Sequence, residues 1–172
     1  MGGMKFIMDS INKLKIDNIW CEIVNKLIKN GLTISIMESC TGGGIANEIT
    51  NISGASSVIK ESYVTYSNEA KIKQGVPEVI IEKFTVYSSE VAIAMAKAVK
   101  ERTGANIGVG VTGQLGRIDP ANPVDKLNVV WFSIINENND VEVEEIHVPD
   151  CDRSEQKKYV IEKIAEKLMF YE

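Results

Sequence analysis

The residues best suited to chemistry lie in one short polar turn, Glu38-Ser39-Cys40-Thr41-Gly42-Gly43-Gly44. The turn follows a β-branched run at 33–37, which predicts a strand, and it precedes a helix predicted over 45–50. Such a turn exposes a hydroxyl, and its glycines let backbone N–H groups approach a ligand closely. The positive end of the following helix favours an anionic ligand or a developing oxyanion. The structural alternative is that Ser39 or Thr41 caps the helix.

Two further polar turns occupy the same kind of position in the chain. Residues 66–71 follow a strand predicted over 58–66, and residues 112–126 follow a strand predicted over 106–111. In a sheet covered by helices, ligands bind beyond the carboxyl ends of the strands. We therefore expect the three turns to converge on one site.

The order of the predicted elements defines the fold that positions these turns. Helices are predicted over 17–30, 77–84, 88–103 and 153–170, and a hairpin of two strands over 127–135 and 141–148. Strands alternate with helices through the first two thirds of the chain, before the hairpin. This order predicts an α/β fold, a three-layer sandwich with a mixed, mostly parallel sheet covered by helices on both faces.

The totals fit one globular domain with a sizeable core, since 44% of the 172 residues are hydrophobic and 25% are charged. We expect residues 1–16 to form an N-terminal arm that opens with an expression remnant before Met4. Residues 17–172 are then a single domain. The sequence has neither a signal peptide nor an apolar run long enough to span a bilayer, so we expect no membrane partner.

Net charge, cysteine content and histidine content argue against several classes of function. A net charge of −5 without a basic stripe argues against a nucleic-acid partner. Three widely spaced cysteines, Cys21, Cys40 and Cys151, form neither a disulfide framework nor a metal-ligand pattern, which favours a cytoplasmic location. The single histidine, His147, excludes a His-rich metal site and argues against a His-based triad.

Several blocks taken together resemble the CinA carboxy-terminal domain family over roughly residues 17–170. Besides the Ser39 turn, they are Tyr63-Val64-Thr65-Tyr66-Ser67-Asn68-Glu69-Ala70-Lys71, residues 86–90, Val111-Thr112-Gly113 and Val130-Trp131-Phe132. The resemblance implies the family's activity as nicotinamide-nucleotide amidase, which hydrolyses the carboxamide of nicotinamide mononucleotide to nicotinate mononucleotide and ammonia. It also implies a homo-oligomer, a dimer or larger, that uses no metal and no cofactor.

By the same resemblance, Ser39, Lys71 and Tyr66 are the expected catalytic residues. Ser39 is the nucleophile, Lys71 is its base if burial lowers the lysine pKa, and Tyr66 relays a proton. Backbone N–H groups around Thr41 to Gly43 are expected to stabilise the oxyanion. The nucleotide is expected to contact a further set of residues: Thr41, Gly42, Gly43, Asn68, Thr112, Gly113 and Arg153. Without the resemblance, a solvated lysine and an ordinary strand tyrosine are the usual interpretations.

The loop after Gly113 departs from the family pattern. The family usually has a longer Gly- and Pro-rich loop there, whereas this chain has one further glycine, Gly116, followed by Arg117. We expect Arg117 to pair with the phosphate or carboxylate of a ligand. Lys157 stands where the family tends to have an arginine. The family's frequent N-terminal pyrophosphatase-type domain is missing from this sequence, so we expect a stand-alone form.

The divergent loop leaves two alternatives to a nicotinamide-nucleotide amidase. One is a catalytically silent nucleotide-binding module on the same fold. The other is an amidase for a different small anionic amide, with Arg117 meeting a different anion. Turnover, or its absence, with a panel of carboxamides separates the three possibilities.

Overall fold

The computed structural model describes residues 19–117, 120, 122 and 127–170. The predicted arm over 1–16 and part of the predicted loop over 114–126 therefore lie outside the described residues. The first element that the structure describes is a helix over 19–30.

In the described part of the chain, five strands form one mixed sheet in the order β2-β1-β3-β4-β5. The strands are β1 (Ile34–Glu38), β2 (Ile59–Val64), β3 (Ile107–Gln114), β4 (Val129–Ile135) and β5 (Val141–His147). Strand β1 pairs in parallel with β2 and β3, while β4 is antiparallel to both β3 and β5. Four of these strands thus point the same way, with β4 reversed.

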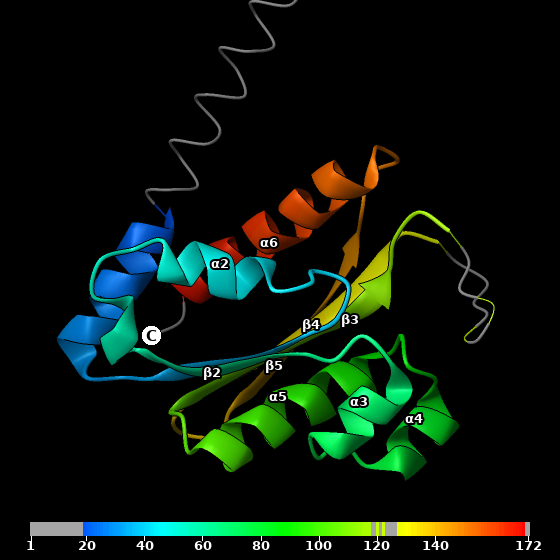
Figure 1. Ribbon diagram of the computed structural model, residues 1–172, viewed down its shortest axis with the longest axis horizontal. Helices are drawn as coiled ribbons and strands as arrows, with labels where there is room; N and C mark the ends of the chain where they lie inside the picture. The colour runs from blue at the N-terminus through cyan, green and yellow to red at the C-terminus, as the bar shows by residue number, and fades with distance from the viewer. Residues whose placement is uncertain (1–18, 118–119, 121, 123–126, 171–172) are drawn as a thin grey trace, which may run out of the picture.

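Helices cover both faces of the sheet, which confirms the predicted three-layer sandwich (Figure 1). On one face lie α2 (Gly44–Thr50), α6 (Arg153–Met169) and the helix over 19–30. On the other face lie α3 (Asn68–Lys73), α4 (Glu78–Phe84) and α5 (Ser89–Thr103). A short 3-10 helix, η1 (Ala55–Ser57), leads into β2.

Strand β1 lies at the centre of two hydrophobic cores, and every residue in it is buried. Ile34 and Ile36 pack into the core under α2 and α6. Met37 packs into the opposite core, under α4 and α5. Because side chains alternate along a strand, β1 is held from both faces, and the turn that follows it begins from a rigid base.

Helix α5 lies directly on β3 because two strand residues lack a side chain. A Cβ atom at Gly110 would lie 2.2 Å from the carbonyl oxygen of Ala92, and one at Gly108 would lie 2.3 Å from that of Ala96. Neither distance is sterically possible. The two glycines therefore set the close approach of the longest helix on that face to the sheet.

Strand β3 continues to Gln114, beyond the predicted end at residue 111. Thr112 and Gly113 pair with Trp131 and Val130 of β4, so they belong to the strand and not to the predicted turn. The antiparallel partner supplies the hydrogen bonds that extend the strand. The sequence pattern missed this extension because a Thr-Gly pair is typical of a turn.

Candidate active site

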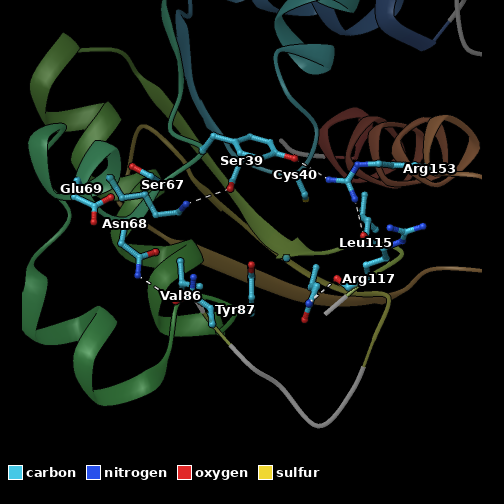
Figure 2. Close-up of a pocket in the computed structure, with 15 residues that line it drawn as sticks. Ser39, Cys40, Ser67, Asn68, Glu69, Val86, Tyr87, Leu115, Arg117 and Arg153 are labelled. Atoms are coloured by element: carbon cyan, nitrogen blue, oxygen red, sulfur yellow. Dashed lines mark hydrogen bonds between the residues drawn. The ribbon is translucent and has the colours of Figure 1, made fainter. Parts of the chain in front are cut away.

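The three polar segments meet beyond the carboxyl ends of β1, β2 and β3, as predicted, around a pocket of about 400 Å³ (Figure 2). The pocket wall comes from the turn after β1, the turn between β2 and α3, and the end of β3 with the residues that follow it. The residues before α5 and the start of α6 complete it. A pocket of this size can hold a small ligand such as a nucleotide.

Ser39 and Lys71, 32 residues apart in sequence, are in contact on the pocket wall. The Nζ atom of Lys71 lies 3.1 Å from Oγ of Ser39 and donates to the carbonyl oxygen of Thr65 at 2.8 Å. Only 1% of Lys71 and 6% of Ser39 is exposed. Ser67 caps α3 by accepting a hydrogen bond from Ala70 N–H, which starts the helix just before Lys71.

Burial lowers the pKa of Lys71 from its ordinary value of 10.5 to about 8. A Cys40 thiolate would oppose this shift, but burial raises the pKa of Cys40 to about 12, so its thiol is uncharged at neutral pH. The two groups that bond the lysine, a hydroxyl and a carbonyl, are also neutral. About half of the Lys71 amines are therefore uncharged near pH 8.

The positive end of α2 is occupied by Glu38, which corrects the expectation that it receives a ligand anion. One carboxylate oxygen of Glu38 accepts hydrogen bonds from Gly43 N–H at 3.0 Å and Ile45 N–H at 3.2 Å. The other accepts from Ala46 N–H at 3.0 Å. Neither Ser39 nor Thr41 caps this helix, so the structural alternative for these hydroxyls does not hold either.

The backbone amides expected to bind an oxyanion are partly engaged. Gly42 N–H donates to the carbonyl oxygen of Ser39 at 3.1 Å, and Gly43 N–H donates to Glu38. These two glycines have positive φ values, 63° and 90°, and so shape the turn instead of lining the pocket. The N–H groups of Cys40 and Thr41 are the remaining candidates, and of these two residues Cys40 lines the pocket. The Thr41 side chain is fully buried, outside the pocket wall.

Tyr66 and Arg153 both line the pocket and are joined by a hydrogen bond. The hydroxyl of Tyr66, a residue that is 62% exposed, accepts a hydrogen bond from Nη2 of Arg153 at 2.8 Å. Nη1 of Arg153 donates to the carbonyl oxygen of Leu115 at 2.5 Å. Among the described residues, the Tyr66 hydroxyl therefore bonds to Arg153 and not to Ser39 or Lys71.

The remaining expected ligand contacts divide into two groups. Asn68, Gly113 and Arg117 line the pocket, and the side-chain N–H of Asn68 donates to Oδ1 of Asn122 at 3.1 Å. Thr112 does not line it: its side chain is fully buried and donates to the carbonyl oxygen of Val86 at 2.7 Å. Thr112 thus holds the segment before α5 in place.

Sequence reasoning missed three residues of the site: Glu38, Thr65 and Gln114. Thr65 contributes its carbonyl oxygen, which carries no sequence signal. Gln114 is buried and lines the pocket, and its side-chain N–H donates to the carbonyl oxygen of Arg117 at 2.7 Å. Its position two residues after Thr112 would have placed it on the same strand face, had β3 been extended.

Two properties of the described residues bear on cofactors and membranes. They contain no group of three or more His, Cys, Asp or Glu side chains arranged to hold a metal ion. None of the helices described is both long enough and apolar enough to cross a bilayer.

The fold and the site define a three-layer α/β protein with a buried serine–lysine contact at the carboxyl edge of its sheet. The family model described as the CinA C-terminal domain matches residues 17–170. The chain belongs to this family.

Relatives and solved structures agree with this assignment. A CinA-like protein of Kosmotoga olearia is 47% identical over 95 residues, which are 55% of this chain and 23% of the relative. The chain spans 22–30% of the length of three curated relatives that it matches. The crystal structure of competence/damage inducible protein CihA from Agrobacterium tumefaciens has a TM-score of 0.82 and 31% identity, covering 90% of this chain and 93% of that one. A competence or damage-inducible protein from Enterobacter asburiae, at 21% identity, shares the fold with a TM-score of 0.82, covering 90% of this chain and 96% of that one.

Proposed function

We propose that this protein is a serine–lysine amidohydrolase that converts nicotinamide mononucleotide to nicotinate mononucleotide and ammonia. The observation that carries the proposal is the 3.1 Å contact between Ser39 Oγ and Lys71 Nζ in a nearly water-free position beside the pocket. A serine becomes nucleophilic when an adjacent base takes its proton, and an uncharged lysine is such a base. The substrate is the one that the sequence resemblance implies.

The first half of the reaction forms an acyl-enzyme. Ser39 Oγ attacks the carbonyl carbon of the carboxamide while uncharged Lys71 Nζ accepts the hydroxyl proton. The carbonyl oxygen becomes an oxyanion, for which the backbone N–H of Cys40, a residue of the pocket wall, is the proposed donor. When the intermediate collapses, the C–N bond breaks and Lys71 returns the proton to the departing amine, which leaves as ammonia.

The second half restores the enzyme. A water molecule attacks the acyl carbon and gives a proton to Lys71, which passes it to Ser39 Oγ as the ester bond breaks. The carbonyl of Thr65 accepts one N–H of Lys71 at 2.8 Å throughout, and so keeps the lone pair of the neutral amine directed at Ser39. The net reaction consumes one water molecule per amide, and Lys71 ends in its starting state.

The charges around the pocket support an anionic substrate. Arg117 and Arg153 line it, and Glu69 is the acidic residue among the described lining. Arg153 is bonded to an uncharged phenol and an uncharged carbonyl, so its positive charge is available to a phosphate. We propose that Arg153 and Arg117 hold the phosphate, with Asn68 near the ribose.

Product analysis with a panel of carboxamides tests the proposal. Purified protein should convert nicotinamide mononucleotide to equal amounts of nicotinate mononucleotide and ammonia, and nicotinamide riboside, which lacks the phosphate, should react poorly. Turnover of a different amide would retain the chemistry and replace the substrate. Tight nucleotide binding by calorimetry with no turnover of any amide would favour the silent binding module instead.

A further inference from the structure

Glu38 is a buried carboxylate that the proposed chemistry does not use. It is fully buried, immediately before Ser39, and is the last residue of the interior strand β1. Its carboxylate accepts hydrogen bonds from three backbone N–H groups, those of Gly43, Ile45 and Ala46. A buried charge is costly unless such bonds compensate it, so this arrangement calls for a physical reason.

The main chain of Glu38 is hydrogen-bonded to Thr65, the residue whose carbonyl oxygen holds Lys71. Its carbonyl oxygen accepts hydrogen bonds from the backbone N–H of Thr65 at 2.8 Å and from the Thr65 hydroxyl at 3.3 Å. The carbonyl oxygen of Thr65 in turn accepts the hydrogen bond from Lys71 Nζ. Lys71 contacts Ser39, which is the neighbour of Glu38 in the chain. The contacts therefore form a closed ring through four residues.

We propose that Glu38 is a positioning residue for the Ser39–Lys71 pair: its carboxylate fixes the start of α2, and its carbonyl fixes the segment that carries Thr65. The catalytic part of this inference rests on the proposed function, whereas the geometric part does not. Glu38 touches neither Ser39 Oγ nor Lys71 Nζ through its side chain, so it acts on them through the backbone.

The carboxylate does something that an ordinary helix cap cannot do here. The N-cap residue of α2 is Gly43, which has no side chain to accept a hydrogen bond. The acceptor comes instead from the preceding strand, so it joins β1 to α2 across the turn that contains Ser39. This turn is fixed at one end by the pairing of β1 and at the other by Glu38.

Loosening the ring would change the protonation of Lys71. Its low pKa comes from burial, and a looser turn admits water, so the pKa should rise towards 10.5. The titratable and charged groups around the pocket, on the described elements and segments that enclose Lys71, are Glu38, Cys40, Tyr66, Glu69, Tyr87, Arg117 and Arg153. Of these, Cys40 is the one that perturbs the pKa of Lys71, and its thiol is uncharged at neutral pH.

The substitution Glu38→Gln tests the role with nearly unchanged side-chain volume. The glutamine side-chain amide must point an N–H donor at a backbone N–H, so the turn should shift. As a result, kcat for nicotinamide mononucleotide should fall about 100-fold, and KM should stay within about twofold of the wild-type value. The pH at which kcat is half-maximal should move above 8. The matched control is Ile49→Val, a buried residue at the other end of α2, which should lower Tm by about 3 °C and leave kcat unchanged.

An NMR titration of the Lys71 side chain gives a readout that does not need activity. In Glu38→Gln the pKa of Lys71 should be higher than in the wild type, and in Ile49→Val it should be the same. A wild type that hydrolyses no amide would remove the proposed function, yet this titration would still decide the geometric role.

The positioning role is overturned if Glu38→Gln lowers Tm but leaves kcat, the pH profile and the Lys71 titration unchanged. If Glu38→Gln does not fold, Glu38→Asp replaces it, because it keeps the charge and shortens the side chain by one methylene. Glu38→Asp should move kcat and the Lys71 pKa in the same directions by smaller amounts. Wild-type values for both would contradict the proposal equally.

Discussion

At the scale of residues, the site depends on a lysine that is deprived of water. Lys71 is 1% exposed and bonded to a hydroxyl and a carbonyl, neither of which stabilises its positive charge as a carboxylate would. Ser39 alone is an unreactive alcohol. In the proposed mechanism Lys71 can act as the base because the cost of burying its ammonium is removed when the amine gives up its proton.

The pH dependence of activity should follow from the lowered pKa of Lys71. The base must be uncharged, so kcat/KM should rise as the pH increases and level off above about 8. Initial rates between about pH 6 and about pH 10 would show the inflection. A rate that is constant over this range, or one that falls as pH rises towards 8, would contradict the assignment of Lys71 as the base.

The same pKa predicts a pH-dependent difference in stability between the wild type and Lys71→Met. The folded-state pKa of about 8 lies below the ordinary 10.5, so the unfolded chain binds more protons between these values. The wild type is therefore penalised below pH 8 and recovers as the pH rises towards 10.5. Urea unfolding at pH 7 and at pH 10 should show the wild type gaining about 2 kcal/mol relative to Lys71→Met. If the difference in free energy of unfolding between the two proteins is the same at both pH values, Lys71 is not desolvated.

The role of Tyr66, as a proton relay or as a support for Arg153, can be tested by removing its hydroxyl. Because that hydroxyl accepts from Arg153, Tyr66→Phe should raise KM about tenfold by loosening the arginine, and leave kcat nearly unchanged. Steady-state kinetics separates the two effects. A large fall in kcat with unchanged KM would restore the proton-relay role that the resemblance implies.

At the scale of elements, local patterns in the sequence predicted most of the helices and strands. The helices at 88–103 and 153–170 were predictable because their apolar residues recur at helical spacing. Ser88 and Gly104 also mark the two ends of the first of these helices. The hairpin of β4 and β5 was predictable from the polar run at 136–140 between two predicted strands. The extension of β3 to Gln114 was not, because a strand end depends on its partner, which lies elsewhere in the chain.

The site was predictable in outline and not in its contacts. Ser39 and Lys71 could be named because the segments that carry them resemble the CinA family, but their 3.1 Å contact depends on the packing of α3 against the sheet. The role of Glu38 could not be read from the sequence, because an acceptor five residues before the N–H it binds matches no ordinary capping pattern. Thr112 was assigned to the ligand, yet its hydroxyl is used inside the protein.

The contact of α5 with β3 gives a prediction about the scaffold. Gly110→Ala would place a methyl group 2.2 Å from the Ala92 carbonyl oxygen, so helix and strand must separate. The free energy of unfolding should fall by about 3 kcal/mol, as measured by urea denaturation. Lys97→Ala, on the exposed side of α5, should change it by less than about 0.5 kcal/mol. Equal effects of the two substitutions would contradict this packing.

At the scale of the whole molecule, a protein of net charge −5 concentrates arginines around its pocket. The overall charge repels anions at a distance, whereas Arg117 and Arg153 attract them within about 10 Å at ordinary salt concentrations. This contrast favours a small anion over a polyanion as the ligand. A homo-oligomer stays a prediction, which light scattering of the purified protein would test.

The most direct measurement of the central claim is ammonia release from nicotinamide mononucleotide by the wild type, Ser39→Ala and Lys71→Met. The wild type should release one ammonia for each nicotinate mononucleotide formed. Both variants, checked for native folding, should be slower by about 10,000-fold or more. Equal rates for the wild type and both variants would contradict the claim that an uncharged lysine activates this serine.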